Sequence, residues 1–173
     1  MTDDVTASHD TVGAGVGDRL FSLEFGRTLC VGCRPAGRCR FGLSLRRDGD
    51  SGVVGTVEFS PEHEGSGGVT HGGSVMGAFD EACGAVPMSV DVLAVTARLE
   101  VDFLRPVPLE RELQIRAWPQ SRDERGHWII RAEIALPGAT GPLCRAEGRF
   151  VERDPETHYR RFHQWLDQQP GQD

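Results

Sequence analysis

The sequence has no apolar run approaching the roughly 18 residues that a membrane-spanning helix needs. Its first ten residues, MTDDVTASHD, lack the basic-then-apolar pattern of a signal peptide. We therefore expect a cytoplasmic protein with no membrane partner. Positive charge is also scarce, because the net charge is −7 at pH 7. Nucleic acid binding needs a basic face, so no nucleic-acid partner is expected, whereas a phosphorylated small molecule needs only a few local arginines.

The number of cysteines is odd. The five are Cys30, Cys33, Cys39, Cys83 and Cys144. An odd count in a chain without an export signal argues against a disulfide framework. The first three, with His63 or His71, could supply the four ligands of a structural zinc ion, but their spacing matches no zinc motif that we recognise. We expect no metal and favour free thiols packed in a lid over a site, with the last two cysteines in the core.

The length and composition indicate one globular domain. The chain has 173 residues, with 38% hydrophobic and 26% charged residues, which suits a single core. We predict an N-terminal tail over residues 1–28, one domain over residues 29–153, and a C-terminal helix and tail over residues 154–173.

One internal helix is expected over Gly73–Val86. Its apolar residues recur with the helical period and spread beyond a single stripe, which indicates a helix buried on most faces and wrapped by a sheet. Pro87 is expected to end it. A second helix is indicated near the C-terminus, where Asp154 is a candidate N-cap and Pro155 suits the first helical position. Its apolar face is expected to pack onto the sheet or a dimer partner, and comprises Tyr159, Phe162, Trp165 and Leu166.

Alternating apolar residues predict strands on both sides of the internal helix. Two strands precede it, joined by the hairpin signal Asp48–Gly52, and residues 61–68 are expected to form a loop. Four strands in a meander follow the helix, over residues 92–104, 113–119, 128–136 and 143–151. The order predicts an α+β fold in which an antiparallel sheet wraps around one long central helix.

The run Thr70-His71-Gly72-Gly73 is the main functional signal, because Asp80 follows the histidine by nine residues. A helix start offers unpaired N–H groups to an oxygen, and glycine lets that oxygen approach the backbone. A carboxylate within a buried helix is unfavourable unless something uses or neutralises it. These features predict a site that polarises and cleaves a carbonyl compound.

Glu81 competes with Asp80 for this role. Neighbouring helical residues point about 100° apart, so only one of them can face a given site. Asp80 lies on the same side of the helix as Met76 and several glycines, and the glycines leave room for a substrate. Glu81 lies nearer Ser74. The spacing from His71 favours Asp80, and Glu81 would pair with an arginine or line the pocket.

The segments THGGSVMGAFDEACG (70–84) and TARLEVDFLRPVP (96–108) resemble the hotdog-fold thioesterases, particularly the PaaI-like acyl-CoA thioesterase group. The shared pattern is a His-Gly-Gly helix start, an acid nine residues after the histidine, and a later strand that ends in Arg-Pro. The resemblance covers about residues 40–152. The Cys-Gly-Cys lead-in of residues 29–43 is a partial match to a bacterial subset of these proteins. Those proteins usually have Asn-Pro and Gly after the cysteines, whereas this chain has Arg-Pro-Ala-Gly-Arg-Cys over residues 34–39.

The resemblance implies a thioesterase that hydrolyses acyl-CoA or acyl-carrier-protein thioesters. It implies Asp80 as base or nucleophile, the Gly73 N–H as the main oxyanion donor, and His71 as the group that orients the loop or substrate. The expected partner is the thioester substrate, with coenzyme A as part of it and no separate cofactor. The active form would be a homodimer or homotetramer, with Asp80 acting on substrate held by the helix start of the partner subunit.

The resemblance also implies binding residues along the helix and the following strand. Thr96 and Arg98 begin the strand that borders the acyl and pantetheine channel, and Arg105 could contact the CoA phosphates or lie exposed at a turn. On the helix the expected binding residues are Gly72, Ser74, Met76 and Gly77. Candidate pocket walls are Met76, Phe79, Met88 and Phe103.

Two other functions remain open. A non-hydrolytic hotdog protein that binds acyl thioesters in a regulatory or accessory role would use the same pocket. A hotdog dehydratase or hydratase would carry Asp and His in a different motif, which we do not find here.

Overall fold

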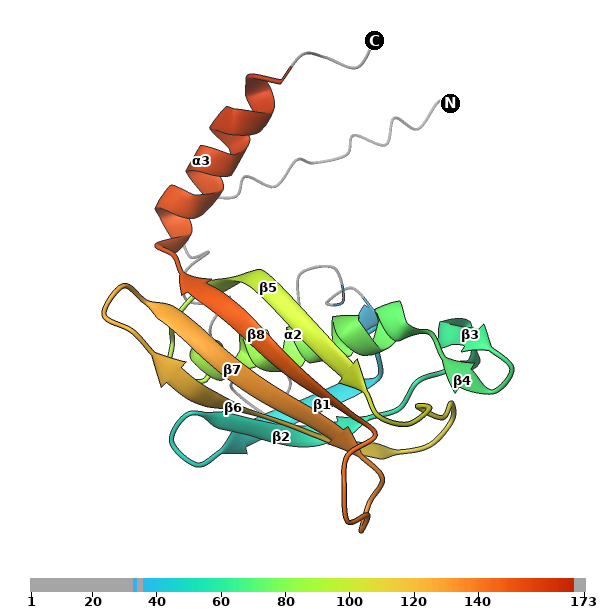
Figure 1. Ribbon diagram of the computed structural model, residues 1–173. Helices are drawn as coiled ribbons and strands as arrows, with labels where there is room; N and C mark the ends of the chain where they lie inside the picture. Colours follow the sequence, from blue (N-terminus) through green and yellow to red (C-terminus); the bar gives the residue numbers. More distant parts are fainter. Residues whose placement is uncertain (1–32, 34–35, 170–173) are drawn as a thin grey trace, which may run out of the picture.

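The computed structural model describes residue 33 and residues 36–169 (Figure 1). The predicted tail over residues 1–28 and Cys30 lie outside these residues. In chain order the elements are β1 (Leu43–Asp48), β2 (Gly52–Val57), a 3₁₀ turn (Pro61–His63), β3 (Glu64–Ser66), β4 (Val69–Thr70), α2 (Gly72–Met88), β5 (Ala94–Phe103), β6 (Leu113–Arg122), β7 (His127–Ala135), β8 (Cys144–Glu152) and α3 (Pro155–Asp167).

The main sheet is antiparallel and six-stranded, with the order β1-β2-β6-β7-β8-β5. The predicted meander of four strands is therefore wrong for β5, which pairs with β8 at the edge, while β6, β7 and β8 do form a meander. The reason is visible in Figure 1, where α2 runs along one face of the sheet. The helix carries the chain from the β2 side to the far edge, and the chain then returns to place β6 beside β2.

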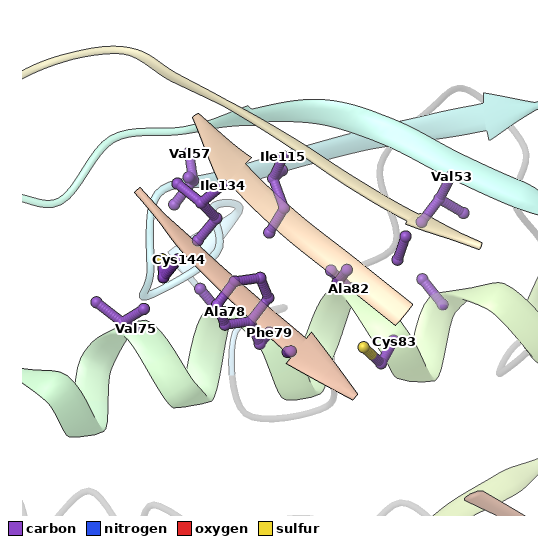
Figure 2. Packing of buried hydrophobic residues seen from close by; sticks show 14 of the residues in the cluster. Val53, Val57, Val75, Ala78, Phe79, Ala82, Cys83, Ile115, Ile134 and Cys144 are labelled. Carbon is purple, nitrogen blue, oxygen red and sulfur yellow. The ribbon is translucent and has the colours of Figure 1, made fainter. Parts of the chain in front are cut away.

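Helix α2 packs onto the sheet through one side. Its buried side chains include Val75, Phe79 and Cys83, which meet inward-facing residues such as Ile115 and Ile134 (Figure 2). This confirms the helix that the period predicted and the expected burial of Cys83. Burial is less complete than predicted, however, because Gly73 and Met76 are exposed. Gly73, Met76 and the half-buried Asp80 thus form a strip along α2 that is left open in the single chain, here called the open strip.

The ends of both helices test the capping predictions. Pro87 does not end α2, because the helix continues through it to Met88. Proline in the last turn removes only one N–H from the helix, and the Ser89 N–H still bonds the Ala85 carbonyl at 2.9 Å. At α3 the prediction is confirmed, since the Asp154 side chain accepts a hydrogen bond from the Thr157 N–H at 2.8 Å.

Helix α3 differs from the prediction in its packing. None of its residues, 155–167, is buried, and it extends away from the sheet past the β5 edge (Figure 1). The predicted packing of its apolar face onto the sheet is therefore wrong, and Trp165, for example, is 56% exposed. No helix among the described residues is long and apolar enough to cross a membrane.

The segment between β2 and α2 is more ordered than the predicted loop. It contains the 3₁₀ turn and the short β3–β4 hairpin. The His71 N–H bonds the His63 carbonyl at 2.7 Å, and a Cβ at Gly65 would lie only 2.8 Å from the His71 Cα. This close backbone approach requires glycine and holds the start of α2 against the hairpin.

Candidate functional site

The His71 ring folds back over the start of α2. His71 is the N-cap, and its Nδ1 accepts a hydrogen bond from the Gly73 N–H at 2.9 Å. A Cβ at Gly73 would lie 3.0 Å from the same nitrogen, so glycine leaves room for the ring. The Gly73 N–H, which the resemblance suggested as the oxyanion donor, is thus already occupied in this arrangement.

The Gly72 N–H has no hydrogen-bond partner among the residues that the structure describes. The next two N–H groups, of Ser74 and Val75, both donate to the His71 carbonyl, at 2.9 and 3.2 Å. Ser74 therefore contributes to the helix start through its backbone. Gly72 is the one position in this first turn whose N–H is available to a ligand, and it lies at the positive end of the helix dipole.

Asp80 lies half-buried on the open strip of α2, two turns beyond this helix start. Its Oδ1 accepts a hydrogen bond of 2.6 Å from the Thr96 hydroxyl of β5. The structure therefore brings together the predicted acid and one of the predicted binding residues. Because Thr96 holds one carboxylate oxygen, the second oxygen remains for a water or a substrate.

A β-bulge in β5 makes this contact possible. Pairing with β8 shifts between Thr96 and Arg98. Strand residues alternate between faces, so Thr96 would otherwise face the side opposite Leu99, which packs against the core. The bulge turns both toward α2. Bulges commonly redirect a side chain in this way next to a site.

The two predicted arginines are engaged elsewhere. Arg98 forms an ion pair with Glu100, on the outer face of the sheet, where Glu100 lines a groove with Asp102 and Arg131. Arg105 donates a hydrogen bond to the Pro142 carbonyl at 3.0 Å. Neither arginine is brought to Asp80. Arg98 follows the bulge and faces away from α2, and Arg105 is bonded to the Pro142 carbonyl.

The other side of the open strip is covered by residues that precede β1. A Cβ at Gly77 would lie 2.4 Å from the Phe41 Cζ, so the predicted space above Gly77 is filled by this ring. Glu81 lies near Cys39, whose thiol pKa is raised mainly by burial and slightly by the Glu81 charge. Glu81 thus faces the lead-in segment, whereas Asp80 faces β5. Sequence reasoning missed Phe41, for which the partial Cys-Gly-Cys match was the one signal.

The predicted pocket walls divide into two groups. Phe79 is fully buried in the core, so it lines no open surface (Figure 2). Met76 is 39% exposed on the open strip, and Phe103 is 50% exposed. A Cβ at Gly72 would lie 3.4 Å from the Phe103 ring, which places Phe103 at the helix start. Met88 is half-buried in the last turn of α2.

The described cysteines are free thiols. The buried Cys33 Sγ accepts a hydrogen bond from the Arg40 N–H at 3.4 Å. Both histidines considered as zinc ligands have hydrogen-bond partners, since the His63 ring contacts the Ser60 hydroxyl at 3.1 Å and the His71 ring bonds Gly73. Within residues 33 and 36–169, no group of three or more His, Cys, Asp or Glu side chains is arranged to hold a metal.

Residues 67–125, which span the motif, Asp80 and Thr96, match the sequence model of the thioesterase superfamily. The predicted resemblance to the hotdog-fold thioesterases is confirmed. No curated protein sequence matches the chain. Among solved structures, a thioesterase superfamily protein is 27% identical with a TM-score of 0.58, and the match covers 62% of this chain and 55% of that one. The chain thus spans just over half the length of that protein.

Two further structures share the hotdog fold. The E. coli PaaI protein from the phenylacetic acid degradation operon is 19% identical over 71% of this chain and 85% of its own, with a TM-score of 0.61. A Streptococcus mutans protein bound to acetyl CoA is 19% identical over 63% of this chain and 86% of its own, with a TM-score of 0.57. These likenesses confirm the α+β hotdog fold.

Proposed function

We propose that the protein hydrolyses acyl-CoA or acyl-carrier-protein thioesters to a free acid and a thiol. The observation that carries this proposal is the Asp80 carboxylate, held by Thr96 at 2.6 Å on the open strip of α2. The surrounding segment matches the thioesterase superfamily. The S. mutans neighbour bound to acetyl CoA supports a CoA thioester as substrate.

Asp80 can act in one of two ways. As a base, it takes a proton from water, and the hydroxide adds to the thioester carbonyl carbon. As a nucleophile, it adds to that carbon itself and forms an anhydride that water then cleaves. In both routes the C–S bond breaks when the oxyanion collapses. The leaving thiolate needs little help from an acid, because thiols are acidic compared with alcohols.

The Gly72 N–H is the oxyanion donor in this proposal. It is unpaired among the described residues and lies at the N-terminus of α2, where partial positive charge favours an oxyanion. His71 is then a positioning residue, because its bond to the Gly73 N–H fixes the first turn and leaves the Gly72 N–H for the substrate.

Two subunits are needed to complete one site. Gly72 and Asp80 are eight residues apart in a helix, which separates them by about 12 Å along the axis. The Gly72 N–H must lie about 3 Å from the carbonyl oxygen, and Asp80 must reach the same carbonyl directly or through one water. Two antiparallel α2 helices would place Gly72 of one chain against Asp80 of the partner subunit. We therefore propose a homodimer, or a homotetramer built from two such dimers.

A thiol-release assay over short, long, branched and aromatic acyl-CoAs tests this function. Replacing Asp80 with Asn should lower kcat/KM by about 10²- to 10⁴-fold, the usual contribution of a general base, with the fold unchanged by circular dichroism. Glu81→Gln is the matched comparison and should cost far less. Tight CoA-ester binding without thiol release by the unchanged protein would instead indicate a binding protein, and equal loss in both variants would contradict the choice of Asp80.

A further inference from the structure

The Phe41 ring lies against the backbone of α2 at Gly77. A Cβ at that position would lie 2.4, 2.8 and 3.0 Å from three carbons of the ring. The ring centroid is 6.1 Å from that of His63, and Phe41 is half-buried against the core. The ring therefore packs directly on the helix backbone, and this packing is possible only because residue 77 is glycine.

The position of the Phe41 ring at Gly77 is beside the proposed catalytic carboxylate of Asp80. Asp80 is three residues after Gly77, which places it about 60° around the helix and less than one turn along it. On the other side of Asp80 stands Thr96 of β5, which is bonded to it. The open strip of α2, which includes Gly73 and Met76, thus has β5 as one wall and Phe41 as the other.

The chemistry of the Phe41 wall suits the acyl part of the substrate. The Phe41 ring packs against the core and pairs with the His63 ring, which in turn pairs with the Phe59 ring at a centroid distance of 5.8 Å. The Phe41 ring offers no donor or acceptor to the amides of a pantetheine arm. A hydrocarbon group gains from contact with such a surface.

We propose that Phe41 determines acyl-chain specificity by filling the space above Gly77, so that the protein prefers short acyl groups. This inference rests on the proposed function and names its substrate class. A chain that extends from a carbonyl at Asp80 toward Gly77 meets the ring within one helical turn. Removing the ring opens that path, whereas enlarging residue 41 shortens it.

The test compares kcat/KM for decanoyl-CoA and butanoyl-CoA. Phe41→Ala should raise the decanoyl-to-butanoyl ratio at least tenfold, because each additional buried methylene contributes about a fourfold gain, and Phe41→Trp should lower it. Gly77→Ala in the Phe41→Ala background should bring the ratio back toward that of the unchanged protein, because the new methyl group occupies part of the vacated space. Leu136→Ala, at a position that is 40% exposed outside the motif, is the control and should leave the ratio unchanged.

The outcomes separate the inference from the function on which it rests. Thiol release with a ratio that stays within twofold in the folded Phe41 variants would overturn the inference alone. Absence of thiol release by the unchanged protein would overturn the proposed function and the inference together. If Phe41→Ala fails to fold, Phe41→Leu and the single variant Gly77→Ala, whose methyl group displaces the ring, give the same comparison.

Discussion

At the scale of residues, the backbone N–H groups in the first turn of α2 differ in their hydrogen bonds. The Gly73 N–H donates to the His71 ring, and the Ser74 and Val75 N–H groups donate to the His71 carbonyl. The Gly72 N–H has no acceptor among the described residues. A pair of glycines in the sequence cannot show this division, because it depends on how the histidine ring turns. The choice of Gly72 over Gly73 therefore required the structure.

Gly72→Pro tests the donor directly. Proline lacks the N–H, and it is favoured at the first position of a helix, which Gly72 occupies. The preceding His71 has φ −59° and ψ 132°, a conformation that a following proline tolerates. We expect kcat to fall by about 10²- to 10³-fold, as when an oxyanion donor is removed.

Gly72→Ala is the control for this experiment, because it retains the N–H and adds a methyl group that contacts only the Phe103 ring, whose nearest carbon lies at 3.4 Å. Activity of the proline variant equal to that of the alanine variant would return the donor role to Gly73. Thermal unfolding of both variants checks that the helix start is intact.

At the scale of elements, Glu152 joins the ends of three strands. Its carboxylate, at the end of β8, accepts hydrogen bonds from Arg122 of β6 at 2.6 and 3.1 Å and from the Trp128 ring of β7 at 2.7 Å. The bonds to Arg122 are the main reason that the Glu152 pKa lies below its usual value, with a smaller contribution from Trp128 and partial opposition from burial. Only the ionised carboxylate makes the full set of bonds.

The sign of the pH dependence follows from this lowered pKa. A carboxyl group with a lower pKa in the folded state stabilises the protein above its unfolded pKa of about 4.3, and this contribution is lost as the pH falls through the folded pKa. We expect Glu152→Gln to lower the free energy of unfolding by about 1 to 2 kcal/mol at pH 7. Urea unfolding of both proteins at pH 7 and pH 3 measures the difference, which should be smaller at pH 3; an equal difference at both pH values would show that the charge is not the cause.

The elements that the sequence predicts well are those with local signals. The period of Val75, Phe79 and Ala82 predicts α2, and Asp154 with Pro155 predicts the start of α3. Long-range pairing has no such signal, so neither the place of β5 beside β8 nor the bulge after Thr96 follows from the alternation of residues. The bulge matters most, because strict alternation would turn Thr96 away from Asp80. Phe41 was missed for the same reason, since only the fold brings it to Gly77.

At the scale of the whole molecule, the proposed dimer would place the open strip of α2 against the same strip of a second copy. Antiparallel helices that place Gly72 opposite Asp80 of the partner subunit have their two-fold axis at the residue midway between these two positions, which is Met76. This side chain is 39% exposed in the single chain, although it is apolar. Methionine adapts well to an irregular contact of this kind.

Met76→Cys tests the arrangement of the subunits. Thiols on a two-fold axis can approach closely enough to form a disulfide, so mild oxidation should link most of the protein into covalent dimers on a non-reducing gel. Leu136→Cys, with a similar exposure of 40% at the end of the sheet, and the unchanged protein should stay largely unlinked. Equal linkage of the two cysteine variants would argue against an antiparallel pair of α2 helices.

Under the proposed function, the thiols of Cys83 and Cys144 must not capture the activated acyl groups that the protein hydrolyses. Burial raises the pKa of both thiols to about 12, and for Cys83, three residues after Asp80, the Asp80 charge adds to this effect. At pH 7 only about one such thiol in 10⁵ is ionised, against a few per cent of an ordinary exposed cysteine. Under that function, the raised pKa values would suppress self-acylation of both thiols. The same two thiols should not react with a thiol reagent used to follow turnover.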